Sequence, residues 1–491
     1  MAMTLHTLAP EQPFVARIAL AQRRPAAVAG RTLMNSAALA AADLVALTAS
    51  LLIAGLLRTW SLDEPRMVLG ATWGVLPLYL GGAALARLLP SYGLGIVEEL
   101  RRVTWVLVAV FGLAVVGLWL AGPGVGAGVA SRLTLGLAGL LSLLLVPFVR
   151  TKAKTWLARR DQWGVPAVVY GAGPAGALVV RQLQEERGMG YVPVAVFDDD
   201  PDRWGDYLDT VPIVGPTDRV ARDAAVAFLA LPEAPREKQI ALLEGPLACY
   251  GTAVVVPDLF EAPSLWVKPR DVAGVLGLEV TSNLARPVAR ALKRALDLGL
   301  AVATAPVWVP LVAVLAVLVW VEDRHAPFFR QERVGRAGCR FRAWKLRTMV
   351  PDADAALARA LDADPALRAE WEAYFKLERD PRITRVGAFL RRASLDELPQ
   401  MINVLRGEMS LVGPRPLPRY HHGELEPRVR ALRESVRPGI TGLWQVSGRS
   451  DTGTLGMERW DPYYVRNWSL WLDLVILVRT LRVVLQRSGA Y

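Results

Sequence analysis

Long apolar runs alternate with basic segments in the first third of the chain. Four of these runs are long enough to cross a hydrocarbon core of about 30 Å, at roughly 36–58, 67–89, 103–122 and 129–149. Arginine and lysine gather before the first run, between the second and third, and after the fourth, whereas the other two connections carry fewer. By the positive-inside rule, this pattern predicts a four-helix transmembrane bundle over residues 1–150 with both ends in the cytosol.

A fifth apolar stretch, from about Leu296 to Val321, is also long enough to cross a membrane. Basic clusters flank it on both sides, and a full crossing would leave one cluster outside the cytosol. Pro306 and Pro310 interrupt its middle, where each proline removes a backbone hydrogen bond and bends the helix. We therefore expect a re-entrant helix over about 290–321 that enters one leaflet and returns, with a fifth full crossing as the alternative.

Residues 151–280 change to short elements that alternate between strand and helix patterns. The string VPAVVYGAGPAGALVVRQLQEE is typical of a buried strand, a glycine turn and a helix, with a GxGxxG motif at Gly171, Gly173 and Gly176. A second apolar strand ends at Asp198, at the spacing of a ribose-binding carboxylate. Further strands at about 225–231 and 252–257 complete a Rossmann-like α/β domain.

Two interpretations of the glycine motif remain open. Backbone amides at a helix start can hold a pyrophosphate, which would make the three glycines and Asp198 nucleotide-binding residues. The glycines could instead only permit a tight turn. No Tyr-x-x-x-Lys pair occurs near this domain, so a short-chain nucleotide-sugar dehydratase would lack its base.

From residue 322 the chain is strongly basic and rich in glycine and proline, and it contains adjacent carboxylates, Asp396 and Glu397, in the string LRRASLDELPQ. A carboxylate can attack phosphorus and become an acyl phosphate, which divides one transfer into two displacements. Cations must offset the charge on the phosphoryl oxygens. The candidates for this phosphate-binding role are Lys345, Arg347, Arg391 and Arg415.

A structural role for the same pair is a capping box, with Ser394 as N-cap and Glu397 reaching back to it. Pro399 counts against a regular helix at this place, because its missing amide should have bonded the carbonyl of Leu395. In either case Asp396 lies near a helix start, where the helix dipole is expected to keep its carboxylate ionised.

Composition narrows the class of protein. Of 491 residues 53% are hydrophobic, which favours a membrane protein, and the net charge of +11 with 16 tryptophans favours anionic lipid or anionic substrate over nucleic acid. The two cysteines and four histidines have no ligand spacing, so neither a disulfide framework nor a zinc site is expected. Most of a set of basic residues should face lipid headgroups, namely Arg330, Arg333, Arg336, Arg340 and Arg342.

Four C-terminal strings closely resemble the polyprenyl-phosphate sugar-1-phosphate transferases, the monotopic phosphoglycosyl transferases. They are APFFRQERVGRAGCRFRAWKLRTM, RITRVGAFLRRASLDELPQMINVLRGEMSLVGPRP, RPGITGLWQVSGRSD and WDPYYVRNWSLWLDLVIL. The likeness runs from about Lys293 to the C-terminus. The four amino-terminal helices, the Rossmann-like middle, and the strings SLWVKPRDVAGVLGLEV and NWSLWLDLVILVRTLRVVLQRSGAY further resemble the large members that transfer galactose 1-phosphate to undecaprenyl phosphate.

This resemblance implies a membrane protein of α plus α/β class, with a mainly helical monotopic catalytic domain at 281–491. It implies that Asp396 attacks the sugar-bearing phosphate of a UDP-sugar and expels UMP, and that undecaprenyl phosphate then takes the sugar phosphate. Glu397 and Asp461 match carboxylates associated with Mg²⁺, and Arg449 matches a position facing the nucleotide. It also implies a homodimer in the bacterial inner membrane, with its catalytic domain on the cytoplasmic face.

Within this family the sugar stays open, because UDP-galactose and UDP-glucose differ in the orientation of one hydroxyl group. Such an enzyme would start O-antigen, capsule or exopolysaccharide synthesis. Two other classes remain. A nucleotide-sugar oxidoreductase or dehydratase would work through the GxGxxG domain, and a non-enzymatic regulator of a polysaccharide assembly complex would release no UMP.

Overall fold

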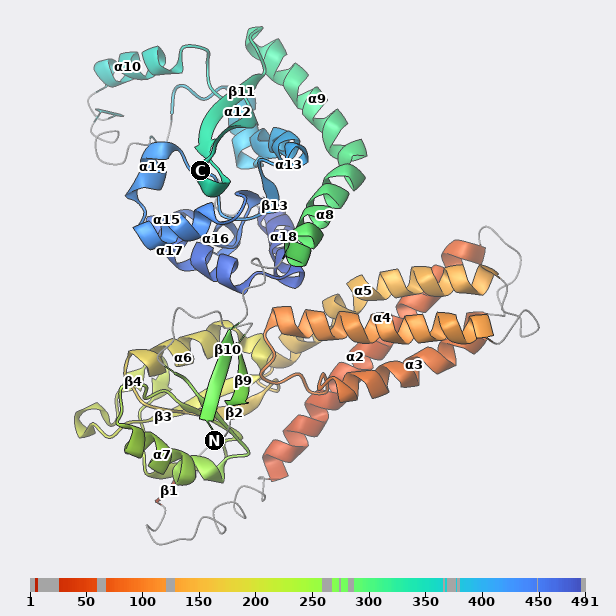
Figure 1. Cartoon of the computed structure of the whole chain (residues 1–491), viewed down its shortest axis with the longest axis vertical. Helices are drawn as coiled ribbons and strands as arrows, with labels where there is room; N and C mark the ends of the chain where they lie inside the picture. The colour runs from red at the N-terminus through yellow and green to blue at the C-terminus, as the bar shows by residue number, and fades with distance from the viewer. Residues whose placement is uncertain are drawn as a thin grey trace. The chain divides into compact units, whose positions relative to one another are not determined.

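The computed structural model describes most of the chain, in two compact units, Met1–Phe260 and Glu261–Tyr491 (Figure 1). The described residues are 5–7, 26–59, 68–120, 129–257, 267–272, 275–280, 287–364, 367–368, 377, 380–447 and 449–486. Each unit has its own helices, strands and apolar core, so the fold of each follows from its own part of the sequence.

The first unit begins with four helices, α2 (Ala26–Thr59), α3 (Val68–Leu85), α4 (Ile96–Leu120) and α5 (Val129–Ala158). They form an elongated bundle (Figure 1) around buried apolar side chains that include Leu47, Leu107 and Val146. Across the described residues four helices are long and apolar enough to cross a membrane: α2, α4, α5 and, in the second unit, α9 (Ala305–Asp323). The predicted second span corresponds to the shorter helix α3, which includes the apolar segment Gly74–Leu85.

Charged side chains join the four helices of the bundle at one end. Arg150 of α5 donates hydrogen bonds to Asp43 of α2, to Glu99 of α4 at 2.6 Å and to the carbonyl of Leu88. The hydroxyl of Tyr79 on α3 donates to Asp43 at 3.1 Å. Because a buried charge is costly unless it is paired, this cluster holds the four helices in one arrangement.

This cluster includes two of the basic residues on which the predicted cytosolic position of the end of α5 is based. Arg150 and Lys154 were counted among the basic residues that follow the fourth apolar run, yet both are buried and both pair with Glu99. The exposed cations that remain beyond this run are Lys152, Arg159 and Arg160. The excess of accessible positive charge at this end is therefore smaller than the sequence alone indicates.

The rest of the first unit is an α/β domain around a four-stranded parallel sheet in the order β3-β2-β7-β8. Its elements are β2 (Val165–Tyr170), α6 (Pro174–Glu185), β3 (Tyr191–Phe197), β7 (Val226–Leu229), α7 (Arg236–Glu244) and β8 (Thr252–Val255). Strand β2 buries alternate residues in cores on the two faces, with Val169 on one face and Val168 on the other. The mixed α/β content with a parallel sheet agrees with the prediction.

Short strands complete the first unit and open the second. They are β1 (Leu5–Thr7), β4 (Tyr207–Leu208), β5 (Val211–Pro212), β6 (Arg219–Ala221), β9 (Val267–Val272) and β10 (Val275–Val280). Strands β9 and β10 form an antiparallel pair in the second unit.

The second unit is mainly helical. It contains α8 (Pro287–Ala303), α9, α10 (Ala353–Ala363), α12 (Arg385–Arg392), the 3₁₀ helix η6 (Leu395–Gln400), α13 (Met401–Arg406), α14 (Arg419–Glu424), α15 (Pro427–Glu434), α16 (Leu443–Ser447), α17 (Arg449–Asn467) and α18 (Leu470–Gln486). Besides β9 and β10, it contains an antiparallel hairpin of β11 (Phe328–Val334) and β12 (Arg340–Leu346), and a parallel pair of β13 (Ser410–Val412) and β14 (Gly439–Thr441).

Helices α8 and α9 meet at a break at Thr304, where the sequence predicts one (Figure 1). Pro306 lies in the first turn of α9 and Pro310 lies inside it, so two backbone amides are missing from this region. One face of α9 packs Leu315 and Val319 against Leu346 and other buried residues of the second unit. The bend and this packing set the direction of α9 relative to the catalytic candidates.

Candidate active site

The adjacent carboxylates Asp396 and Glu397 lie on η6, a short 3₁₀ helix between α12 and α13. Ser394, which precedes it, has a left-handed backbone (φ 54°), and its side chain makes no capping hydrogen bond. The carboxylate of Glu397 instead contacts side chains from other parts of the unit. The capping-box interpretation is therefore wrong for this pair.

Glu397 is held by two cations. Lys345 Nζ on β12 donates to Glu397 Oε1 at 2.8 Å, and Arg415 donates to Oε1 at 2.7 Å and to Oε2 at 3.3 Å. Burial alone would raise the pKa of Glu397, but the charges of Arg415 and Lys345 more than offset this and hold its pKa well below the ordinary range. Glu397 is therefore ionised at neutral pH, and it fixes both cations beside Asp396.

Asp396 has a different environment. Its Oδ2 lies 3.8 Å from Lys345 Nζ, beyond hydrogen-bonding distance. Burial raises the pKa of Asp396, Lys345 opposes this, and the charge of Glu397 raises it further, with a net increase above 3.8. Asp396 lies in the first turn of η6, as predicted, but desolvation is the largest influence on its pKa. The result is a desolvated carboxylate held beside cations without a short ion pair.

The predicted phosphate-binding cations separate into two groups. Arg391 donates to Thr348 Oγ1 at 2.9 Å, and its charge lowers the pKa of Asp396, so it acts on the same site as Lys345 and Arg415. Arg347 instead forms an ion pair with Asp323 at the end of α9, with Nη2 2.5 Å from Oδ1. The side chain of Arg449 lies outside the described residues, so its predicted role stays a prediction.

Arg333 is a cation of this site that the sequence analysis assigned to lipid headgroups. Its guanidinium donates to the carbonyl of Pro416 at 3.2 Å, and burial lowers its pKa, with the charge of Arg415 adding to the effect and that of Glu397 opposing it. Arg333 pairs with Phe341 across the hairpin, on the face that also carries Lys345. The alternation of side chains along the two strands would have predicted this position of Arg333 if the register of β11 and β12 had been known.

Asp461 is buried on α17 and forms an ion pair with Arg433. Burial raises the pKa of Asp461 to about 6, and the charge of Arg433 opposes this. Arg433 also donates to the carbonyl of Arg415 at 2.5 Å. Asp461 is thus linked to the site through Arg433 and the Arg415 backbone, so its role in the structure is to help position Arg415.

The donors available for Mg²⁺ are few. Within the described parts of the chain, no group of three or more His, Cys, Asp or Glu side chains is placed to hold a metal ion. Mg²⁺ commonly binds through one or two carboxylates together with substrate phosphates and water. Of the two predicted metal residues, Glu397 lies beside Asp396, where one carboxylate together with diphosphate oxygens fits that mode. Both predicted residues are paired with cations, Glu397 with Lys345 and Arg415 and Asp461 with Arg433.

The glycine motif of the first unit forms a closed turn. Gly171 has φ 111°, and a Cβ there would lie 2.5 Å from the carbonyl oxygen of Ala230. A Cβ on Gly176 would lie 1.9 Å from the carbonyl oxygen of Gly171, whereas one on Gly173 would meet nothing within 4 Å. The carboxylate of Asp198 accepts from the amide of Ala172 at 2.6 Å. These contacts show that Gly171 and Gly176 permit a tight turn, and the nucleotide-binding role of the motif stays a prediction.

Comparison with known proteins decides the family. Residues 288–487 match the model for bacterial sugar transferases, and residues 93–228 match a model for a CoA-binding domain. The UDP-galactose-lipid carrier transferase of Erwinia amylovora is 38% identical over 366 residues, which cover 72% of this chain and 75% of that protein. The chain belongs to the bacterial sugar transferase family. The resemblance recognised in the sequence is thereby confirmed.

Other relatives of this sugar transferase carry related names. The undecaprenyl-phosphate galactose phosphotransferase of Salmonella typhimurium is 36% identical over 359 residues, 71% of this chain and 74% of that protein. The UDP-glucose:undecaprenyl-phosphate glucose-1-phosphate transferase of Escherichia coli is 31% identical over 351 residues, 68% and 71% of the two chains. These relatives confirm the prediction of a sugar phosphotransferase in the membrane. They do not support the two alternative classes, an oxidoreductase and a non-enzymatic regulator.

Proposed function

We propose that this sugar transferase moves galactose 1-phosphate from UDP-galactose to undecaprenyl phosphate, releases UMP, and so starts the synthesis of an O-antigen, capsule or exopolysaccharide. The observation that carries the proposal is the buried pair Asp396 and Glu397, with Lys345 and Arg415 fixed beside it. Two relatives that match over most of this chain have galactose in their names, which favours this sugar.

In the first step a carboxylate oxygen of Asp396 attacks the phosphorus that carries the sugar. The bond from this phosphorus to the bridging oxygen breaks, UMP leaves with that oxygen, and the sugar phosphate is attached to Asp396 as an acyl phosphate. Lys345, Arg391 and Arg415 offset the charge that builds up on the phosphoryl oxygens. Arg415 keeps its guanidinium plane fixed because Glu397 holds it through two contacts.

In the second step an oxygen of undecaprenyl phosphate attacks the same phosphorus. The bond between phosphorus and the Asp396 oxygen breaks, the carboxylate is regenerated, and the lipid diphosphosugar is formed. Glu397 is the residue that would hold Mg²⁺, and the bound ion would offset part of the negative charge of the diphosphate. Since nucleotide sugars are cytosolic, we propose that this site faces the cytoplasm at the bacterial inner membrane.

A re-entrant path for α8 and α9 is part of the proposal, because the lipid acceptor must reach Asp396. On α8, Asp297 accepts from Ser410 Oγ at 2.8 Å and from the amide of Leu411 at 3.2 Å. At the far end of α9, Asp323 pairs with Arg347. The middle of α8 and the end of α9 thus both contact other elements of the same compact unit, which supports an arrangement with both flanks on one side of the membrane.

Labelling of single cysteines tests this path. Cysteine replaces Val288 in the first turn of α8 or His325 after α9, both exposed, in a chain whose own Cys249 and Cys339 are changed to serine. A membrane-impermeant maleimide is expected to label both positions from the cytosolic side of inverted vesicles. The control is Leu120→Cys, at the end of α4 that is predicted to lie outside the cytosol. Its labelling is expected only from the non-cytosolic side of the membrane. Labelling of the two flanks from opposite sides would contradict the re-entrant helix.

The sugar is tested by following UMP release. Purified protein with undecaprenyl phosphate and Mg²⁺ receives UDP-galactose, UDP-glucose, UDP-N-acetylglucosamine or UDP-N-acetylgalactosamine. UDP-galactose is expected to react at least tenfold faster than the others, because a site that hydrogen-bonds one hydroxyl orientation rejects the epimer. A preference for UDP-glucose would keep the reaction and change the sugar, whereas no UMP from any of them would overturn the proposed function.

A further inference from the structure

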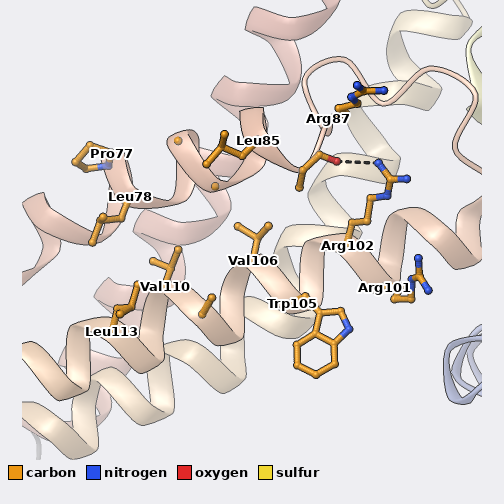
Figure 2. Close-up of a pocket in the computed structure, with 14 residues that line it drawn as sticks. Pro77, Leu78, Leu85, Arg87, Arg101, Arg102, Trp105, Val106, Val110 and Leu113 are labelled. Atoms are coloured by element: carbon orange, nitrogen blue, oxygen red, sulfur yellow. Dashed lines mark hydrogen bonds between the residues drawn. The ribbon is translucent and has the colours of Figure 1, made fainter.

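A second feature lies in the helical bundle of the first unit. Helices α3 and α4 leave an open groove between them with a volume of about 1160 Å³ (Figure 2). Its walls are mainly apolar and include Leu78, Leu85, Val106 and Leu113. Leu85 is 89% exposed and Leu113 is 62% exposed, so the groove opens to the surroundings of the bundle.

The groove has a charged end and an apolar end. Arg87, Arg101 and Arg102 gather at one end, and Pro77 and Leu113 lie at the other (Figure 2). Glu98 pairs with Arg101 at 2.7 Å and with Arg102 at 2.8 Å. Arg102 also donates to the carbonyl of Ala86 at 2.9 Å, whereas no ion pair of Arg87 occurs among the described residues, so the guanidinium of Arg87 adds positive charge here. This end of the groove is therefore positive, and it complements a phosphate.

The length of the groove matches one leaflet of a bilayer. Arg101 and Leu113 are separated by twelve residues of α4, which corresponds to about 18 Å of helix. Half of a hydrocarbon core measures about 15 Å. Trp105, one turn from Arg101 and 63% exposed, lies between the charged and apolar parts, where tryptophan is typical of the membrane interface.

We propose that this groove binds one anionic phospholipid, with its phosphate at Arg87, Arg101 and Arg102 and an acyl chain along the groove toward Leu113. An acyl chain of ordinary length fits the distance of one leaflet, whereas the undecaprenyl chain is much longer. The charge at one end distinguishes this ligand from a zwitterionic lipid. The groove is formed by residues of the first unit alone, and its proposed ligand does not depend on the sugar that is transferred.

Glycine makes room for this ligand. Gly81 and Gly82 line the groove on α3, and a Cβ added at Gly82 would approach Val106 Cγ1 to 3.0 Å. A Cβ at Gly81 would meet nothing within 4 Å. A larger side chain at Gly81 can therefore fill the groove without displacing α4, which gives a selective way to close the site.

Native mass spectrometry of the full chain in neutral detergent tests the proposal. It measures the binding of added phosphatidylglycerol, phosphatidylcholine or undecaprenyl phosphate. Phosphatidylglycerol is expected to bind at least fivefold more tightly than phosphatidylcholine, and Arg87→Gln to weaken it about fivefold. Gly81→Leu should reduce it more strongly than Gly81→Ala. The matched controls are Arg159→Gln, an exposed cation beyond the groove, and Gly136→Leu, on an open face of α5, and both should bind as the wild type does.

Each other outcome overturns the proposal. Equal binding of phosphatidylcholine, or equal loss in the controls, would mean ordinary solvation by lipid. Displacement of phosphatidylglycerol by undecaprenyl phosphate, with the same dependence on Gly81, would make the acceptor the occupant. A change of oligomeric mass in Gly81→Leu would make the groove a contact between two copies. Unfolding curves of all variants ensure that a loss of binding is not a loss of fold.

Discussion

Asp396→Asn is expected to abolish the transfer of sugar phosphate, by a factor on the order of 10⁴ or more. An amide cannot form the acyl phosphate, and the cations around it have no other carboxylate in position to attack, because Glu397 is engaged by Lys345 and Arg415. UMP release and the appearance of labelled lipid product measure the loss. Asp362→Asn, on exposed α10, removes the same charge away from the site and is expected to have no effect.

Two further readouts separate a missing nucleophile from a disturbed fold. Without undecaprenyl phosphate, the wild type is expected to exchange labelled UMP into UDP-galactose through the acyl phosphate, and the variant is not. Because burial raises the pKa of Asp396 above that of an ordinary aspartate, wild-type turnover should fall as the pH drops through that pKa and protonates the carboxylate. Unfolding of the variant should match the wild type within about 1 kcal/mol. Retained exchange in Asp396→Asn would exclude the covalent mechanism.

The parallel sheet and the broken apolar helix could be predicted because their signals are local. In β2 the run VPAVVY is apolar without interruption, as expected of a strand covered on both faces, and Gly171 follows at the point where a positive φ is needed. Pro306 and Pro310 likewise predict a break without knowledge of any neighbour, and the helix breaks at Thr304. Such features depend on backbone chemistry within a few residues.

The assignment of cations could be predicted only in part. Lys345 and Arg347 are two residues apart on or just after the same strand, yet one contacts Glu397 and the other pairs with Asp323 on α9. Which partner each cation contacts depends on how α9 packs in the tertiary structure, and the local sequence does not determine this. Arg333 was missed because its contribution needs the register of the hairpin, which places it on the same face as Lys345.

The ion pairs of Arg150 likewise depend on how the four helices pack, and the sequence alone does not predict them. Replacement of Arg150 is expected to have a large effect on stability. Arg150→Met is expected to lower the free energy of unfolding by about 3–5 kcal/mol, because it leaves Asp43 without its cation and removes one of two from Glu99 inside an apolar bundle. Reversible unfolding in detergent, followed by circular dichroism, measures the change. Lys152→Met removes an exposed cation two residues along α5 and is expected to change stability by less than about 0.5 kcal/mol.

A double variant distinguishes an unpaired charge from lost packing. Asp43→Asn removes the charge that Arg150→Met leaves behind, while its amide oxygen can still accept from Tyr79. The double variant should therefore be more stable than Arg150→Met alone, with a coupling of at least about 1 kcal/mol. If the two effects simply add, or if Lys152→Met costs as much as Arg150→Met, the buried ion pairs do not hold the four helices together.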